Sequence, residues 1–93
     1  MGKTSVVNIK SGISRTAEGV VYIGRPSKWG NPFVVGVHGS RFECIERYRQ
    51  WLQNQSHLLE QLHELRGRRL ACFCKPFPCH GDVLAEMADG LAE

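Results

Sequence analysis

The 93-residue sequence lacks any run close to the roughly 18–20 consecutive apolar residues that a transmembrane helix needs. Its first ten residues, MGKTSVVNIK, also lack the charged-then-apolar pattern of a secretory signal peptide. Internal repeats and low-complexity segments are missing too, whereas 42% of the residues are hydrophobic, which is enough for one core. We therefore expect a single α/β domain over residues 1–93 that is cytoplasmic and has no membrane partner.

The sequence also lacks a strong excess of charge of either sign. The 12 Lys and Arg residues against 9 Asp and Glu residues give a net charge of +3, and the basic residues fall in scattered groups. A dedicated DNA-binding protein usually carries a dense basic stripe, so this class is disfavoured. The mild positive excess nevertheless attracts phosphate groups.

The four cysteines are not expected to form disulfides, because a cytoplasmic chain is kept reduced. None of them stands in the C-x-x-C pair of a redox motif. We therefore expect free thiols or metal ligands.

Short β-branched runs alternate with segments of helical periodicity. Strands are expected at residues 5–10, 19–23 and 68–74, with a further short one at 33–35. Helices are expected from residue 40, after residue 56 and over about 81–91. This alternation predicts a small two-layer or three-layer Rossmann-like sheet of three or four strands with about three helices.

The clearest local signal is a helix start at Ser40. Ser40 and Glu43 stand at the spacing of a capping box, in which each side chain binds the backbone N–H of the other residue. The inward face of this helix is expected to comprise Phe42, Ile45, Tyr48 or Arg49, and Leu52. The next helix is expected to bury Leu58, Leu59, Leu62 and Leu65 and to end at Gly67. A homodimer through this helix is a further expectation, because a chain this small gains stability by dimerising.

The segment GRPSKWGNPF, residues 24–33, follows a predicted strand and holds residue types that recognise anions and rings. An arginine binds a phosphate through two nitrogen atoms, and a nearby lysine adds a point charge. A tryptophan stacks on a base, and an asparagine reads a polar edge. The alternative is a rigid turn in which the tryptophan fills the core. The candidate ligand-binding residues here are Arg25, Ser27, Lys28, Trp29 and Asn31.

The segment RLACFCKPFPCHGDVLAE holds three cysteines and one histidine within nine residues. Cys79, His80 and Gly81 are expected at the N-terminus of a helix, where free backbone N–H groups favour an anion. The helix dipole lowers the pKa of a thiol there, which makes Cys79 or Cys74 a candidate nucleophile with His80 as its base or acid. Gly81 lets a ligand approach the backbone, and Asp82 either caps the helix or orients His80.

The same cysteines are also candidate zinc ligands. Cys72 and Cys74 stand two apart on a strand and face the same side, so their thiols can converge with Cys79 and His80 on one ion. The spacing C-x-C-x4-C-H departs from the C-x2-C pairs of common zinc sites. A third interpretation makes Cys72 and Cys74 small buried core residues.

The two motifs together carry a resemblance. RPSKWGNPF at residues 25–33 and CFCKPFPCHGDVLAE at residues 72–86 resemble an uncharacterised domain family of small bacterial and phage-type proteins, over roughly residues 6–88. The resemblance brings no established activity. The Cys-His pair between a strand and a helix is also similar to a second α/β family with a C-H-R motif, in which an arginine stands at the position of Gly81. This second similarity implies a Rossmann-like or flavodoxin-like layout.

Three functions fit these observations. The first is binding of, or enzymatic action on, a nucleotide, nucleoside or related phosphorylated ligand in a cleft between residues 24–33 and 74–82, as a transferase or hydrolase with a Cys/His site. This cleft requires the two preceding strands to be parallel neighbours. The second is a zinc-stabilised module that binds nucleic acid or a protein. The third is an interaction protein with an exposed apolar patch around Trp51 or Leu58–Leu59.

Overall fold

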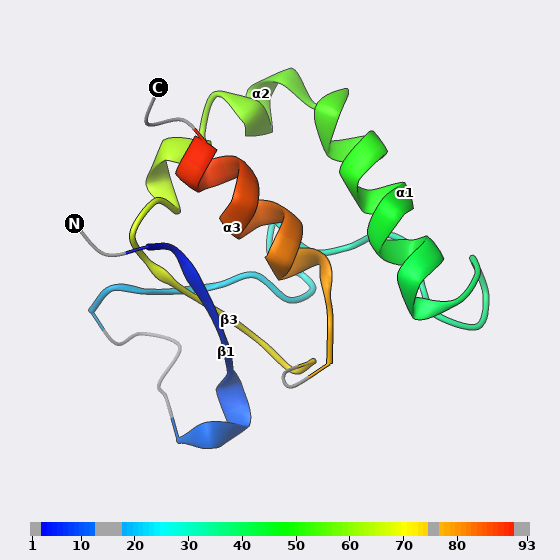
Figure 1. Ribbon diagram of the computed structural model, residues 1–93, viewed down its shortest axis with the longest axis horizontal. Helices are drawn as coiled ribbons and strands as arrows, with labels where there is room; N and C mark the ends of the chain where they lie inside the picture. Colours follow the sequence, from blue (N-terminus) through cyan, green and yellow to red (C-terminus); the bar gives the residue numbers. More distant parts are fainter. Residues whose placement is uncertain (1–2, 13–17, 75–76, 91–93) are drawn as a thin grey trace.

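The computed structural model of the protein describes residues 3–12, 18–74 and 77–90, and Figure 1 shows how they are arranged. The elements are β1 (Ser5–Asn8), η1 (Ile9–Ser11), β2 (Val20–Tyr22), α1 (Arg41–Gln53), α2 (Ser56–Leu59), η2 (Leu62–Glu64), β3 (Arg69–Cys72) and α3 (His80–Gly90). The prediction of a Rossmann-like α/β fold with about three helices is confirmed, and the sheet has three strands.

The sheet forms around β3, which lies between β1 and β2 and pairs in parallel with both. Ser5 and Val20 both align with Arg69, so the three strands run in register and their carboxyl ends reach the same edge. Three of the four residues of β3 are buried, as expected for the middle strand of a parallel sheet: Leu70, Ala71 and Cys72.

Local hydrogen bonds fix the start of α1. The Ser40 Oγ accepts the N–H of Glu43 at 3.2 Å, and the Glu43 carboxylate accepts the N–H of Ser40 at 2.9 Å. These two bonds satisfy N–H groups that the first helical turn leaves without partners. The predicted capping box is therefore confirmed.

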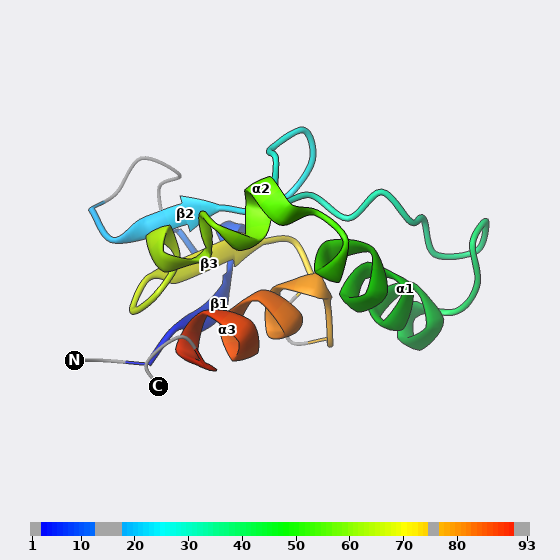
Figure 2. The same ribbon diagram turned by 90° about the horizontal axis from the view of Figure 1, so that it is seen from above.

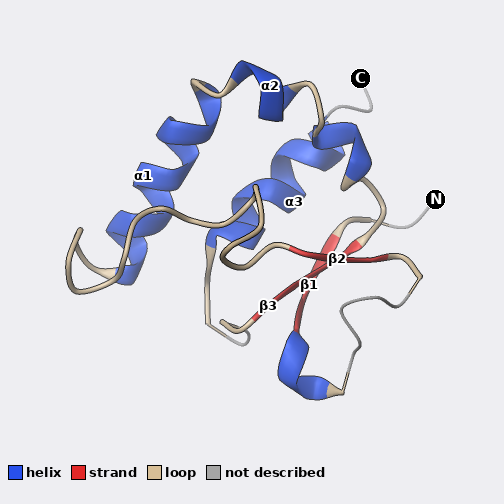
Figure 3. Ribbon diagram, turned by 180° about the vertical axis from the view of Figure 1, so that it is seen from behind, coloured by secondary structure: helices blue, strands red, loops and turns tan. Residues whose placement is uncertain are grey.

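The helices cover the sheet and one another. Helix α3 packs on β1 and β3, and α1 lies beside α3, as Figures 1 and 2 show. Seen from behind in Figure 3, the long connection after β2 runs from the sheet across to the start of α1. The core between these elements includes Ile23, Tyr48, Leu52, Leu65, Leu70 and Leu84.

Several boundaries and faces differ from the sequence predictions. Residues 33–35 form no strand, because they lie in the loop whose turn at 34–38 is closed by backbone bonds from Val37 and His38 to Val34. Phe42 is 74% exposed, and Cys44 takes its place on the inward face with Tyr48 and Leu52. The predicted end of α3 at residue 91 lies outside the described residues.

The segment after residue 56 is two short turns, α2 and η2, rather than one helix. Its leucines are nonetheless inward, since Leu58, Leu62 and Leu65 are at most 3% exposed and belong to the core. Gly67 ends the segment with a φ of 76°, a left-handed conformation that favours glycine. Because these leucines pack inside their own chain, a homodimer, which stays a prediction, would need another surface. The predicted patch around Leu58 is likewise not exposed.

No helix among the described residues is both long enough and apolar enough to cross a membrane.

A candidate ligand-binding cleft with a cysteine cluster

A cavity of about 310 Å³ opens at the carboxyl edge of the sheet, between the loop that follows β2 and the loop that follows β3. These strands are parallel neighbours, so the two loops face each other as the sequence analysis required. We call this cavity the cleft. Six of the predicted residues line it: Arg25, Asn31, Cys72, Cys74, Cys79 and His80.

Trp29 does not line the cleft. It is 2% exposed and belongs to the hydrophobic core, and the hydroxyl of the buried Tyr48 donates a 2.7 Å hydrogen bond to its backbone carbonyl. An indole packed in this way has no open face for a base. The prediction that Trp29 stacks on a ligand is therefore wrong for this structure, and the alternative interpretation, a tryptophan that fills the core, is the correct one.

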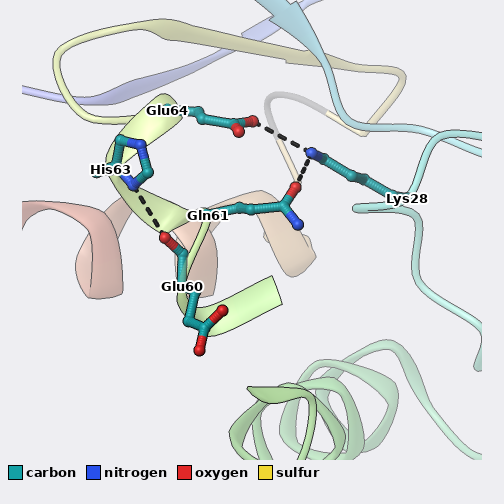
Figure 4. A network of polar contacts seen from close by, with 5 residues as sticks. All are labelled: Lys28, Glu60, Gln61, His63 and Glu64. Carbon is teal, nitrogen blue, oxygen red and sulfur yellow. Dashed lines mark hydrogen bonds and ion pairs between the residues drawn. The ribbon is translucent and has the colours of Figure 1, made fainter. Parts of the chain in front are cut away.

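Lys28 is engaged on the far side of the same loop. Its Nζ forms an ion pair with Glu64 at 3.2 Å and a hydrogen bond with Gln61, as Figure 4 shows. Both partners belong to the segment around η2, so Lys28 ties the loop to that segment and does not line the cleft. Ser27 does not line the cleft either, and its buried hydroxyl has no hydrogen-bond partner in the described part of the chain.

Asn31 shapes the cleft wall. Its Oδ1 accepts the N–H of Phe33 at 2.9 Å, and its Nδ2 donates to the carbonyl of Cys44 at 3.4 Å. The first bond fixes a local turn, and the second fastens this turn to α1. Asn31 therefore has a structural role at the edge of the cleft. A ligand that bound its amide would have to displace the N–H of Phe33 or the carbonyl of Cys44.

The three cysteines of the second motif form one cluster. Cys72 ends β3, Cys74 lies two residues further on, and Cys79 directly precedes α3, yet their Sγ atoms all lie within 4.8 Å of one another. The Sγ atoms of Cys72 and Cys79 are 3.4 Å apart and share a hydrogen bond. Cys72 and Cys79 are buried and Cys74 is half-buried, and none of the three is in a disulfide bond. We call this group the cysteine cluster; it is suited to binding a soft or borderline metal ion such as zinc.

His80 stands apart from the cluster. Its Nε2 lies 2.8 Å from the backbone carbonyl of Ile23, and because a carbonyl only accepts, Nε2 carries the proton. Its ring also meets that of Tyr48 edge-on, with 5.0 Å between the centroids. Burial lowers the pKa of His80, and the positive charge of Arg25 lowers it further. The expected four-ligand set is therefore incomplete, since His80 is not part of the metal-binding group.

The surroundings of Cys79 act against the predicted activation of its thiol. The hydrogen bond with Cys72 raises the pKa of Cys79, and burial raises it further, although the N–H of Gly81 at 3.3 Å acts in the opposite direction. A negative charge on Cys72 or Cys74 would repel a second negative charge on Cys79, so the neighbouring cysteines also raise the pKa of Cys79.

The next two residues have structural roles. A Cβ at Gly81 would come within 2.8 Å of Ile23 and 3.1 Å of Val6, so glycine lets the start of α3 approach the sheet. Asp82 accepts the N–H of Cys79 at 3.1 Å and so caps α3, which was one of its two predicted roles. Gly81 does not line the cleft, so its absent side chain serves packing rather than a ligand.

Nine residues that line the cleft were not among the predicted site residues, and they include Tyr22, Phe33, Arg41 and Phe73. Arg41 begins α1, donates to the carbonyl of Pro78 at 3.3 Å and lies over the ring of Phe77 at 5.4 Å. Phe73 stands between two cluster cysteines and is 48% exposed. Strand alternation over C-F-C would have turned Phe73 away from the thiols, but β3 ends at Cys72 and Phe73 lines the same cleft as they do. Nothing local in the sequence marks Arg41 either.

The fold and the site together define a small parallel α/β domain whose cleft at the carboxyl edge of the sheet is walled by cysteines. The chain belongs to the family described as "Domain of unknown function (DUF4326)", whose model matches residues 7–90. The family resemblance predicted from the two motifs is thereby confirmed.

A phage protein is similar over much of the chain. It is the "Uncharacterized 12.4 kDa protein in nrdA-td intergenic region" of Enterobacteria phage T4, which is 39% identical over 75 residues. The alignment covers 76% of this chain and 68% of the phage protein. No solved structure matches the chain.

Proposed function

We propose that the cleft binds a small phosphorylated ligand with a planar ring, of the nucleotide or nucleoside class. The observation that carries this proposal is the meeting of two arginines and several aromatic rings in one cavity at the carboxyl edge of parallel strands. Open α/β sheets bind ligands at this edge. The volume of about 310 Å³ is at the lower end of the range for small-molecule sites, which favours a mononucleotide over a dinucleotide.

The two arginines supply the anion-binding part of the site. Arg25 comes from the loop after β2 and Arg41 from the start of α1, so a phosphate between them would be held from two sides of the cleft. Guanidinium groups bind phosphate through paired N–H donors in a fixed plane. With Lys28 bound to Glu64, the phosphate-binding role that the sequence assigned to the lysine passes to Arg41.

Two aromatic side chains that line the cleft, Phe73 and Tyr22, form the ring-binding part of the site. Phe73 presents a half-exposed ring, and the ring of Tyr22 meets it edge-on at 6.2 Å. Aromatic faces stack on nucleobases with little sequence preference, at roughly 1–3 kcal/mol per base. Phe73 and Tyr22 therefore replace Trp29 as the surface for a base.

Binding is favoured over a Cys–His transfer reaction. A thiol nucleophile needs a base within hydrogen-bond reach, about 2.6–3.2 Å. Within the described residues His80 is instead hydrogen-bonded to Ile23, and the pKa of Cys79 is raised. Cys74, which is half-buried in the cleft wall, is the thiol best placed to meet a ligand.

Isothermal titration calorimetry with a defined set of ligands tests the proposal. The set contains the common nucleoside monophosphates, the matching nucleosides, inorganic phosphate and a short oligonucleotide. We expect one monophosphate to bind more tightly than its nucleoside or phosphate, because ring and anion are held together. Binding of the oligonucleotide alone, with steep salt dependence, would instead support a nucleic-acid-binding module.

A further inference from the structure

We propose that the cysteine cluster is an open metal site, in which Cys72, Cys74 and Cys79 hold one zinc-type ion and leave a fourth position facing the cleft. The inference does not depend on the ligand proposed above, because it rests on the three thiols alone.

The distances suit a metal ion. A zinc–thiolate bond is about 2.3 Å long, so a tetrahedral ion holds its sulfur ligands about 3.8 Å apart. The Sγ atoms of the cluster lie within 4.8 Å of one another, and those of Cys72 and Cys79 are 3.4 Å apart. Only small side-chain rotations separate this arrangement from a coordinated one.

The chemistry of the donors narrows the choice of ion. Thiolates are soft ligands that favour zinc and copper(I) and discriminate against magnesium and calcium, which prefer oxygen. The backbone N–H of Gly81 points to the sulfur of Cys79 at 3.3 Å and would stabilise the thiolate form. Such a hydrogen bond to a ligand sulfur is the kind of outer-shell contact that metal sites use.

Among the described residues, no fourth side chain joins the cluster. The group that can reach one ion contains three cysteines and no histidine or carboxylate. His80 is bound to the carbonyl of Ile23, and Asp82 is bound to the N–H of Cys79. Structural zinc sites are closed by four protein ligands, whereas sites that act on a ligand have three and one open position. The cluster has the second composition.

The open position faces the cleft, since all three cysteines line it. A zinc ion with three thiolates carries one net negative charge, which the guanidiniums of Arg25 and Arg41 outweigh. The cleft would therefore still attract an anion, and a donor atom of a small molecule could complete the coordination of the metal.

Anaerobic titration of the full, reduced and metal-free chain with Co²⁺ tests this inference. We expect one Co²⁺ per chain, with strong sulfur-to-metal charge-transfer absorption and the visible bands of a tetrahedral ion. Added imidazole should shift the visible bands and leave the charge-transfer absorption in place, because it enters the open position. Stoichiometry of one ion per two chains, or visible bands insensitive to imidazole, would overturn the open site.

Two cysteine variants provide the matched comparison. Cys74→Ser should weaken Co²⁺ binding roughly a hundredfold or more, beyond the 10–100-fold loss typical of removing an outer-shell group. Cys44→Ser alters a buried cysteine that lines the same cleft but lies outside the cluster, and it should leave the spectrum unchanged. His80→Gln should also retain the charge-transfer absorption. Absence of this absorption from the unmodified chain, or a Cys74→Ser protein that binds Co²⁺ as tightly as the unmodified chain, would overturn the proposal.

Discussion

The hydroxyl of Tyr48 donates a 2.7 Å hydrogen bond to the backbone carbonyl of Trp29, and both side chains are buried. Burial raises the pKa of Tyr48, so the hydroxyl keeps its proton and remains a donor. This bond joins α1, which carries Arg41, to the loop that carries Arg25. The two arginines of the cleft are thus held on elements that are fastened to each other inside the core.

The substitution Tyr48→Phe should lower the free energy of unfolding by about 1–2 kcal/mol, because it leaves the buried carbonyl of Trp29 without its partner. Urea unfolding measures this change. Tyr22→Phe is the matched control, since the Tyr22 hydroxyl donates to the carbonyl of Arg25 at an exposed position and water can replace it. An equal decrease in the free energy of unfolding of the two variants would show that the buried Tyr48 hydrogen bond stabilises the fold no more than the exposed Tyr22 hydrogen bond.

The second prediction concerns Gly81, which allows α3 to approach the sheet closely. Gly81→Ala should destabilise the protein by about 1–3 kcal/mol, because the new methyl group would lie 2.8 Å from Ile23 and 3.1 Å from Val6. Gly90→Ala, at the other end of α3, meets nothing within 4 Å and should be neutral or stabilise by up to about 1 kcal/mol. Thermal unfolding compares the two. A Gly81→Ala protein as stable as the parent would contradict the packing role.

Stability at acid pH should depend on Asp89. Its carboxylate accepts the side-chain hydroxyl of Thr4 at 2.6 Å and the backbone N–H of Thr4 at 3.1 Å, and these bonds lower the pKa of Asp89 below its ordinary value of 3.8. The contribution to stability is therefore complete above the unfolded-state pKa and is lost as pH falls through the folded-state pKa. Urea unfolding at a series of pH values gives the free energy of unfolding of the parent and of Asp89→Asn. The difference between the two should shrink as pH falls below about 4. Parallel curves from neutral to acid pH would refute this coupling.

Ligand binding should depend on Arg41. Arg41→Gln should weaken binding of a nucleoside monophosphate about tenfold to a hundredfold, since a hydrogen bond to a charged group contributes about 1.5–3 kcal/mol. Its stability should change by less than about 0.5 kcal/mol, because the side chain is exposed. Arg47→Gln alters an exposed arginine of the same helix away from the cleft and should bind normally. Calorimetry that finds equal affinities for both variants would remove Arg41 from the site.

Local features of the fold could be read from the sequence. The capping box at Ser40 and Glu43 was predictable because both partners lie within one helical turn. Gly67 and the strand at β3 were predictable for the same reason, since a chain reversal and a buried β-branched or apolar run have local causes. The facing of the two loops across one cleft required only that two strands be parallel neighbours, a common arrangement in α/β folds.

Long-range contacts could not be read in this way. The sequence shows that Trp29 is a flat ring in a loop, but the core that buries it is built from distant residues such as Tyr48, which lies 19 residues away. Lys28 is a free cation in the sequence and an ion-paired one in the structure, because Glu64 is 36 residues away. The inward face of α1 was placed at Phe42 instead of Cys44, since periodicity alone gives several neighbouring choices. Function-bearing residues such as Arg41 reach the cleft only through the tertiary fold.

Two-dimensional ¹H–¹⁵N NMR titration of the reduced chain with each nucleoside monophosphate tests the central claim most directly. We expect one of them to shift saturably the backbone signals of Gly24, Arg25, Asn31, Arg41 and Cys74, which all belong to the cleft. Signals of Gly67, which lies before β3 at the other edge of the sheet, and of Gly90 at the end of α3 should stay in place, because neither residue lines the cleft. No saturable shifts with any monophosphate, or shifts confined to residues outside the cleft, would contradict the account.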